Sequence, residues 1–431
     1  MHDTPEPTPE PTRRAAYAWA CYDWANSAFA TTVMAGFFPL FFKQYWNSGV
    51  ADTLSTFRLG MANSIASLIV VLGAPLLGAI ADHMDTRKGF LLLFSALGVV
   101  MTGSLYFVAA GDWQIAALCY VLAVLGFSGG NLFYDSLLIF VARPTQLDRI
   151  SALGFALGYL GGGVLFAVNV LMVLHPDWFG LPDKSAAVRT SFLTVAVWWA
   201  VFTVPVLMSV HEPRAAQPTR LRAALSQGFG QLRHTLRDIG RLPQTFLFLL
   251  AYWLYIDGVD TIIRMAVDYG LSLGFPSNSL IVALLITQFV GFPAAIAFGR
   301  IGERIGARTG ILIALAVYMV VTAWGAFMSQ VWEFYLLAVV IGLVQGGVQS
   351  LSRSLYARLI PAGRSAEFFG FYNMLGKFAA VLGPALMGWV GVLTGNPRLG
   401  ILSVLVLFVL GAALLTRVDL ERGRQNAMKH G

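Results

Sequence analysis

Charged residues are scarce in this sequence. Asp, Glu, Lys and Arg together make up 12% of the 431 residues, whereas soluble globular chains carry about 25%. Hydrophobic residues make up 57%, and they form runs of about twenty residues, the length that an α-helix needs to cross the hydrocarbon core of a bilayer. This pattern excludes a water-soluble fold. It also excludes a membrane β-barrel, which would show short alternating stretches instead.

Cysteine is scarce too, and the familiar catalytic motifs are absent. The only cysteines, Cys21 and Cys119, lie in apolar helical patterns, so a disulfide framework or a thiolate metal site has no support. The sequence has no Gly-x-x-x-x-Gly-Lys-Ser/Thr loop for a nucleotide and no His-Glu-x-x-His pair for zinc. We therefore expect no cofactor, no metal ion and no enzymatic activity, and we expect any energy that the protein uses to come from a gradient.

Apolar runs broken by Gly, Pro and charged residues predict twelve membrane-spanning helices. They begin near Tyr17, Thr56, Gly89, Trp113, Leu153, Thr190, Thr245, Asn278, Arg308, Val331, Phe368 and Leu399. We expect an acidic, proline-rich and disordered cytoplasmic tail (1–16), an N-terminal six-helix bundle (17–210), a basic linker (211–243), a C-terminal six-helix bundle (244–418) and a cytoplasmic C-terminal tail (419–431).

The basic residues indicate the orientation of the chain. In the linker, apolar residues recur at helical spacing among arginines, which is typical of an amphipathic helix bound to anionic lipid. Of the 29 Lys and Arg residues, twenty-two fall on the linker side. Six fall opposite, namely Lys43, Arg58, Lys184, Arg189, Arg264 and Arg398. Since Lys and Arg collect in cytoplasmic loops, we expect both termini in the cytoplasm. We therefore attribute the net charge of +7 to membrane orientation and to contact with membrane lipids. We expect no nucleic acid as a partner.

An internal repeat divides the chain into two halves. The loop Gly78–Lys88 (GAIADHMDTRK) is similar to Gly299–Arg308 (GRIGERIGAR), and the same offset of 221 residues that joins Asp82 to Glu303 joins Gly162 to Gly383. Such repeats are typical of transporters built from two six-helix halves, with the solute site between the halves near mid-membrane.

Several segments carry a family resemblance. The Asp82 loop resembles the signature loop of the major facilitator superfamily. The segments Tyr22–Phe29 (YDWANSAF), Ala251–Gly258 (AYWLYIDG), Gln349–Ser354 (QSLSRS) and Glu367–Tyr372 (EFFGFY) resemble the autophagy-related vacuolar amino-acid effluxer family and its bacterial relatives.

This resemblance implies the major facilitator fold, with twelve transmembrane helices in two pseudo-symmetric six-helix bundles, and efflux of amino acids such as leucine. We expect a bacterial inner membrane protein that works as a monomer, because one chain of twelve helices suffices as a working unit. Two residues depart from the family pattern: Asp135 stands where an uncharged Asn is expected, and the second signature loop has Glu303 without a paired basic end.

In the first span, Asp23 and Asn26 begin a polar stripe on one helical face. Charged side chains inside a membrane cost about 2.5 to 3.5 kcal/mol each, so the stripe is expected to face the central cavity. Alternatively, Asp23 caps or hydrogen-bonds near the cytoplasmic surface.

In the seventh span, Asp257, Asp260 and Arg264 share one face, and Tyr255 lies just before them. A carboxyl group at mid-depth can take up and release protons, so Asp257 is the candidate for proton coupling. Alternatively, Asp260 pairs with Arg264 within the helix, and Asp257 bonds neighbouring backbone.

The eleventh span contains Asn373 and, one turn later on the same face, Lys377. A buried ammonium group needs a carboxylate or an anionic group on the solute. Either partner is possible here, and a carboxylate-bearing solute such as an amino acid would fit the second.

Asp135 in the fourth span and Gln345, Gln349 and Arg353 in the tenth are expected to line the cavity. With Asp23 they could close an inner gate by ion pairing between the halves. Alternatively, Arg353 anchors its helix at the membrane interface.

Other residues are expected to act in gating and not as solute ligands. They are Gly78, Asp82, Arg87 and Lys88 in the first signature loop, Glu303 and Arg308 in the second, and Glu367.

The sequence as a whole predicts a secondary transporter for a small polar solute, an amino acid above all, coupled to protons. The alternatives are an exporter or flippase-like carrier of lipids, drugs or other metabolites, and a receptor or enzyme on the same fold.

Overall fold

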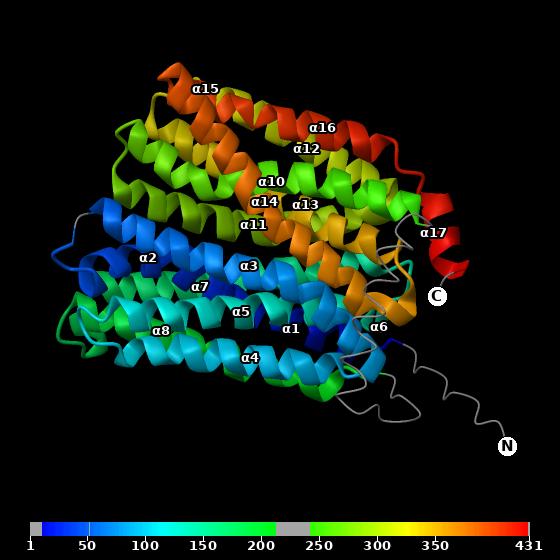
Figure 1. The fold of residues 1–431 in the computed structure, drawn as a ribbon, viewed down its shortest axis with the longest axis horizontal. Coiled ribbons are helices and arrows are strands. Elements are labelled where there is room, and N and C mark those ends of the chain that lie inside the picture. The colour runs from blue at the N-terminus through cyan, green and yellow to red at the C-terminus, as the bar shows by residue number, and fades with distance from the viewer. Residues whose placement is uncertain (1–10, 51, 213–241, 430–431) are drawn as a thin grey trace.

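The computed structural model describes residues 11–50, 52–212 and 242–429 of the chain. Within these ranges, twelve helices are long and apolar enough to cross a membrane. They run side by side along the longest axis of the molecule, and the start of α1 and the helix α17 lie at the same end of the bundles (Figure 1). The predicted fold class is confirmed. We call the end that carries Val210 and Leu242, on either side of the linker, the linker side.

The first half of the chain forms one bundle. The first span runs from Arg13 to Trp46 and the others follow in order. Its elements are α1 (Arg13–Ala28), η1 (Phe29–Phe37), α2 (Phe38–Phe41), η2 (Phe42–Trp46), α3 (Asp52–Met84), α4 (Arg87–Ser104), η3 (Leu105–Phe107), α5 (Trp113–Ser136), α6 (Leu138–Val141), α7 (Leu147–Leu174), η4 (Pro176–Phe179) and α8 (Lys184–Ser209).

The second half forms the other bundle. Its elements are α10 (Pro243–Ser272), α11 (Ser277–Ile305), α12 (Ala307–Gly325), α13 (Val331–Ala357), η6 (Ala362–Arg364), α14 (Ser365–Thr394), α15 (Pro397–Ser403), α16 (Leu405–Thr416) and α17 (Leu420–Lys429). The predicted C-terminal tail therefore contains a helix, α17. Residues 1–10 of the predicted disordered tail and 213–241 of the predicted linker lie outside the described residues.

Several helices begin earlier than the hydropathy pattern predicts, and polar caps extend two of them, α1 and α8, beyond the apolar runs. The helix α1 begins at Arg13 instead of near Tyr17, and the Thr12 hydroxyl accepts a hydrogen bond from the Ala15 N–H. The helix α8 begins at Lys184 instead of near Thr190, where Asp183 accepts from the Ala186 N–H at 2.7 Å. Similarly, α7 begins at Leu147 instead of near Leu153.

The first span changes its winding where it borders the centre of the molecule. Residues Phe29–Phe37 and Phe42–Trp46 are wound as π-helix, separated by one short α-helical turn that contains Pro39. The wide turns of a π-helix are rare in proteins, and those that occur often lie at functional sites. Here they carry Thr31 into the space between the two halves.

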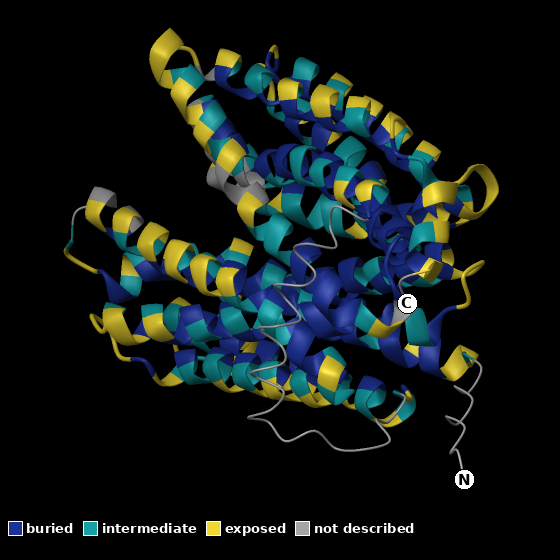
Figure 2. Ribbon diagram, turned by 45° about the vertical axis from the view of Figure 1, so that its right-hand side comes forward, coloured by how far each residue is buried: buried dark blue, intermediate teal, exposed yellow. Residues whose placement is uncertain are grey.

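Packing between the halves is uneven. The helix α7 packs against α11 and α13, and α14 packs against α3 and α5. Near the linker side α14 crosses α3, and the two ribbons diverge toward the opposite end (Figure 1). Large apolar side chains such as Leu72 and Val392 are exposed on the outside of the bundles, whereas the interior is buried (Figure 2). A bilayer covers such an apolar exterior.

Candidate functional site

A cavity of about 330 Å³ lies between the two halves. It is lined from one half by α1, η1, α5 and α7, and from the other by α10, α11, α13 and α14. Its wall carries acidic, basic and amide side chains together, which is unusual for a membrane interior. A polar cavity at the interface of two repeats is where transporters of this architecture bind their solutes.

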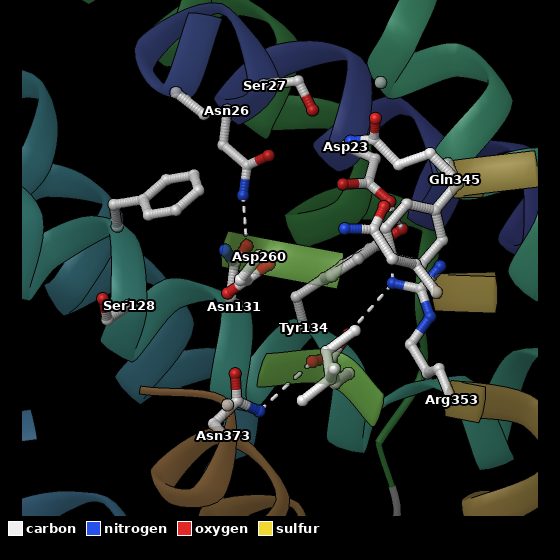
Figure 3. Close-up of a pocket in the computed structure, with 18 of the residues that line it drawn as sticks. Asp23, Asn26, Ser27, Ser128, Asn131, Tyr134, Asp260, Gln345, Arg353 and Asn373 are labelled. Carbon is white, nitrogen blue, oxygen red and sulfur yellow. Dashed lines mark hydrogen bonds and ion pairs between the residues drawn. The ribbon is translucent and has the colours of Figure 1, made fainter. Parts of the chain in front are cut away.

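The structure brings most of the predicted pathway residues together. Those that line the cavity are Asp23, Asn26, Asp135, Asp260, Gln345, Gln349, Asn373 and Lys377. They come from α1, α5, α10, α13 and α14, so residues far apart in the sequence share one site (Figure 3). Tyr255 and Asp257 lie outside this lining, and the side chain of Arg264 lies outside the described residues.

Arg353 of α13 is the centre of the polar network. Its Nη1 lies 2.9 Å from Asp135 Oδ1 and 3.5 Å from Asp23 Oδ2, both on the other half. Its Nε donates to the Ser151 hydroxyl at 2.9 Å, and its Nη2 donates to the Ser151 carbonyl at 2.8 Å. The guanidinium group is thus bonded on every nitrogen, and Arg353 is 2% exposed.

Aromatic rings surround the same guanidinium group. Its carbon lies 4.3 Å from the centroid of Phe155, 4.8 Å from Trp19 and 5.2 Å from Tyr134. Faces of aromatic rings attract a cation, and more strongly where water is excluded. The site therefore stabilises a buried positive charge with two carboxyl groups and three rings.

The network around Arg353 has one guanidinium group and two carboxyl groups. Tyr134 donates to Asp23 Oδ2 at 3.0 Å, and Asn373 donates to Asp135 Oδ2 at 3.2 Å. With both carboxyl groups ionised, the cluster carries a net negative charge. One of them can therefore hold a proton without leaving Arg353 unpaired.

Amide side chains extend the polar lining along the interface. Tyr159 of α7 donates to Gln349 Oε1 at 2.9 Å, and the Gln288 amide of α11 donates to Thr31 Oγ1 at 3.2 Å. Both bonds join the two halves. Asn26 and Asn131 are also hydrogen-bonded to each other, within the first half.

Asp260 and Lys377 contribute charges of opposite sign from the second half. Both line the cavity, from α10 and α14. Lys377 Nζ lies 6.0 Å from the centroid of Phe127 on α5, so the ammonium group faces the first half. The cavity therefore offers both a cation and a carboxylate apart from the Arg353 cluster.

Asp257 is buried inside the second half, and it is 0% exposed. Its Oδ1 accepts a hydrogen bond from the backbone N–H of Gly383 at 2.9 Å, next to Pro384 within α14. Within the described residues its Oδ2 has no hydrogen-bond partner. Tyr255, two residues earlier, shares a hydrogen bond of 2.7 Å with Ser352 of α13, so it joins two helices of the same half.

The first signature loop joins the two halves on the linker side. Asp82 of α3 accepts from the backbone N–H groups of Ala366 at 3.0 Å and Glu367 at 2.7 Å, in the first turn of α14. Negative charge is favourable at a helix N-terminus. Arg87 lies 2.6 Å from the same carboxylate. Gly78 is required by this approach, because an added Cβ would clash with the Ala366 carbonyl.

Glu212, which follows α8, was not predicted. It accepts from the backbone N–H groups of Arg87 at 2.7 Å and Lys88 at 3.1 Å, and its Oε1 lies 3.1 Å from Arg87 Nη1. Lys88 in turn donates to the Val210 carbonyl at 2.6 Å. The sequence signal was weak: an acidic residue at the start of a basic segment.

The remaining predicted gating residues have different surroundings. Glu367 is buried and lies 3.0 Å from Arg364. Arg308 donates to the Val418 carbonyl at 2.9 Å, within its own half, and Glu303 is exposed. Among the described contacts, the second signature loop thus does not join the two halves as the first one does.

A second connection on the linker side was also missed by the sequence analysis. Arg358, just after α13, binds both carboxylate oxygens of Asp148 on α7, at 2.7 and 3.0 Å. Ser354 also donates to Asp148, and Ser151 donates to the Ser350 carbonyl at 2.8 Å. These contacts and those of Asp82 and Arg353 lie between the linker side and the cavity, so this end of the interface is closed.

Comparison with known proteins gives consistent results. Residues 55–428 match a family model described as "Vacuole effluxer Atg22 like". The "Uncharacterized MFS-type transporter YxiO" of Bacillus subtilis is 38% identical over 406 residues, covering 94% of each chain. "Autophagy-related protein 22-1" of Phaeosphaeria nodorum is 26% identical over 525 residues, covering 98% of this chain and 93% of its own.

Solved structures with the same fold are transporters. FucP, a major facilitator superfamily transporter in the outward conformation, superposes with a TM-score of 0.72 at 12% identity, over 94% of this chain and 98% of its own. The human organic anion transporter MFSD10 superposes with a TM-score of 0.69 at 17% identity, over 94% and 99%. At these identities the likeness concerns the fold alone.

Proposed function

Because this chain belongs to the Atg22-like vacuole effluxer family and is an integral membrane transporter of the major facilitator type, we propose that it exports amino acids by alternating access, coupled to protons. We place it as a monomer in a bacterial inner membrane, with the linker side in the cytoplasm. The twenty-two Lys and Arg residues of that side support this orientation.

The charge pattern of the cavity is the observation that carries the proposal. The cavity is lined by Asp23, Asp135 and Asp260 and by the cations of Arg353 and Lys377. The head of an amino acid carries an ammonium and a carboxylate group, so each finds a partner of opposite charge. These charges disfavour an apolar drug as the solute, because an apolar drug would remove water from the charged wall and offer it no polar group in return.

Alternating access requires contacts between the halves that can break and reform. The ion pairs of Arg353 with Asp135 and Asp23 are such contacts, because they join α13 to α5 and α1. When the halves separate on the linker side, the two carboxyl groups lose their cation. Solute and protons then compete for the same groups, which would couple the two fluxes.

Asp257 is the proposed proton-coupling residue. It is fully buried, one of its oxygens has no hydrogen-bond partner within the described residues, and the other bonds the Gly383 N–H. A neutral, protonated carboxyl group is cheaper to bury than an ionised one. A change in its protonation would act on α14 at Gly383, next to Pro384, and α14 carries Asn373 and Lys377 into the cavity.

The test is uptake of a mixed panel of labelled amino acids into proteoliposomes, with and without an imposed pH gradient. Asp257→Asn is compared with wild type and with Asp112→Asn, a matched control at an exposed position. We expect one class of amino acid to move in wild type and in the control, driven by the gradient, and Asp257→Asn to lose that dependence. If no amino acid moves through well-folded protein, the proposed solute class is wrong.

A further inference from the structure

A second compartment lies beside the charged cavity, mostly within the C-terminal half and bordered by η1 of the other half. Its volume is about 260 Å³, and it shares Ala30, Thr31, Gln288 and Gln345 with the charged cavity. Its other walls come from the parts of α10, α11, α12 and α13 that lie away from the linker side. The two compartments therefore adjoin at these four residues, one with a charged lining and the other without.

The wall of the adjoining compartment is apolar. Side chains such as Ile262, Leu284 and Leu337 line it, and no charged residue does so among those the structure describes. Its hydroxyl groups already donate to backbone carbonyls: Tyr269 to Gly325 at 2.9 Å and Thr322 to Tyr318 at 2.7 Å. An apolar cavity without free polar partners does not hold water well and takes up apolar groups instead.

We propose that this apolar compartment binds the bulky apolar group of a zwitterionic solute whose charged head lies in the charged cavity. The inference rests on the proposed function, because the solute bound here is the solute that the protein transports. A water molecule occupies about 30 Å³ of liquid, so the compartment has room for about nine non-hydrogen atoms. This exceeds the four carbons of a leucine side chain and fits an indole ring or the paired side chains of an apolar dipeptide.

A hydrogen-bond acceptor lies at the junction between the two compartments. The side-chain oxygen of Gln345 is buried and has no hydrogen-bond partner within the described residues. Gln288, its neighbour in the lining, already donates to Thr31. Because an unmatched buried acceptor is costly, Gln345 is suited to accept an N–H from the solute at the point where its head joins its apolar group.

The test compares zwitterions with growing apolar groups: alanine, leucine and tryptophan, which share one head, and leucyl-leucine, whose ammonium and carboxylate groups are separated by a peptide bond. Binding is measured on purified protein, and flux is measured in proteoliposomes. Since each buried methylene is worth about fourfold in affinity, we expect wild type to bind tryptophan at least tenfold more tightly than alanine. Ala338→Phe, which fills the compartment, should remove this preference and leave alanine binding within about twofold.

Two further variants keep the test decisive. Ala316→Phe, at an exposed position of α12, is the matched control and should behave as wild type. Leu337→Ala enlarges the compartment and should favour tryptophan over leucine, so the test does not depend on Ala338→Phe folding. The proposal is overturned if wild type shows no preference for the larger groups, or if Ala338→Phe weakens every member of the series equally.

The outcomes also separate the two proposals. Flux of alanine without any gradation by size would leave the proposed transport function standing and reject the apolar compartment. Graded binding without flux of any member would support the compartment and reject amino-acid transport. Absence of both binding and flux would overturn both proposals.

Discussion

Arg353 of α13 reaches across the interface to Asp135 of α5, with 2.9 Å between Nη1 and Oδ1. The aspartate stands where the family pattern leads one to expect an uncharged asparagine. Its second oxygen accepts from Asn373 of α14 at 3.2 Å. One carboxylate thus links three helices across both halves, beside the solute cavity, and this link underlies the first prediction.

Arg353→Gln should destabilise the protein and stop transport. It leaves the buried carboxylates of Asp23 and Asp135 without their cation, and removal of one partner of a buried ion pair costs about 3–5 kcal/mol. Arg353→Lys should restore only part of the stability, because an ammonium group cannot reproduce the planar set of donors to Asp135 and Ser151. Thermal unfolding in detergent and flux in proteoliposomes measure both effects.

An exposed ion pair provides the control. Arg422 lies 3.3 Å from Asp419 on the surface, with 79% of its side chain exposed, so Arg422→Gln should leave unfolding and flux unchanged. Equal losses in Arg353→Gln and Arg422→Gln would contradict the prediction, because the Arg353 effect would then come from net charge alone.

Asp82→Asn should weaken closure of the linker side. The carboxylate caps the first turn of α14 and pairs with Arg87, and both interactions need its charge. A loss of about 1–3 kcal/mol would shift the population of the closed state by roughly five- to 150-fold. Distances between spin labels on the two halves, measured on the linker side, report this population.

The internal repeat provides a matched control for Asp82. Glu303 is its counterpart in the second half, and it is exposed. Glu303→Gln should therefore leave the distance distribution as in wild type. If both variants open the linker side to the same extent, closure does not depend on the contact between Asp82 and α14.

The fold was predictable from the sequence because a bilayer imposes a fixed minimum length of apolar helix on each span. A span must be about twenty apolar residues long, and all twelve predicted spans are present in the structure. The ends of helices were less predictable, since α1 and α8 extend through capped polar turns that hydropathy does not register. Exposure to lipid and burial in protein select similar residues, so hydropathy also does not identify which face of a helix meets its neighbour.

The cavity lining was predictable in part, because the bilayer also penalises polar side chains that face lipid. Polar residues such as Asn26, Gln349 and Lys377 are costly in lipid, so their presence in spans indicated the interior. Whether such a residue lines the cavity or packs within one half depends on how its helix is rotated about its own axis. On α10 this rotation places Asp260 in the cavity lining and Asp257 outside it. Asp148 and Arg358 were missed because they lie 210 residues apart near helix ends, where charges are common.

The Asp148 and Arg358 contact should behave as a charge-dependent latch. Asp148→Arg and Arg358→Asp should each lower transport, because each places two like charges at a bidentate site between the halves. The double variant should recover part of the loss, since it restores opposite charges. Arg358 is partly exposed, so we expect a coupling energy of about 1 kcal/mol, measured by a double-mutant cycle on thermal stability. A coupling energy of zero would mean that the pair does not hold the halves together.

Gly383 of α14 is a position where even a single added methyl group should be poorly tolerated. An added Cβ would clash with the hydroxyl of Thr261 and lie 2.8 Å from Asp257 Oδ1. Gly383→Ala should therefore push α14 away from α10 and break the hydrogen bond from Gly383 to Asp257. Overpacking of this kind costs about 1–3 kcal/mol, and flux should fall together with the thermal unfolding temperature.

The second-site variants decide whether the clash is the cause. Thr261→Ala removes the hydroxyl that the new methyl group meets, so it should restore part of the stability of Gly383→Ala, whereas Thr261→Ser keeps the hydroxyl and should not. Gly388→Ala is the control in the same helix, because no described atom lies within 4 Å of a Cβ at that position. Recovery of stability without recovery of proton-dependent flux would indicate that the bond between Gly383 and Asp257 itself serves coupling. Recovery of neither, with Gly388→Ala normal, would contradict the packing of α10 against α14 described above.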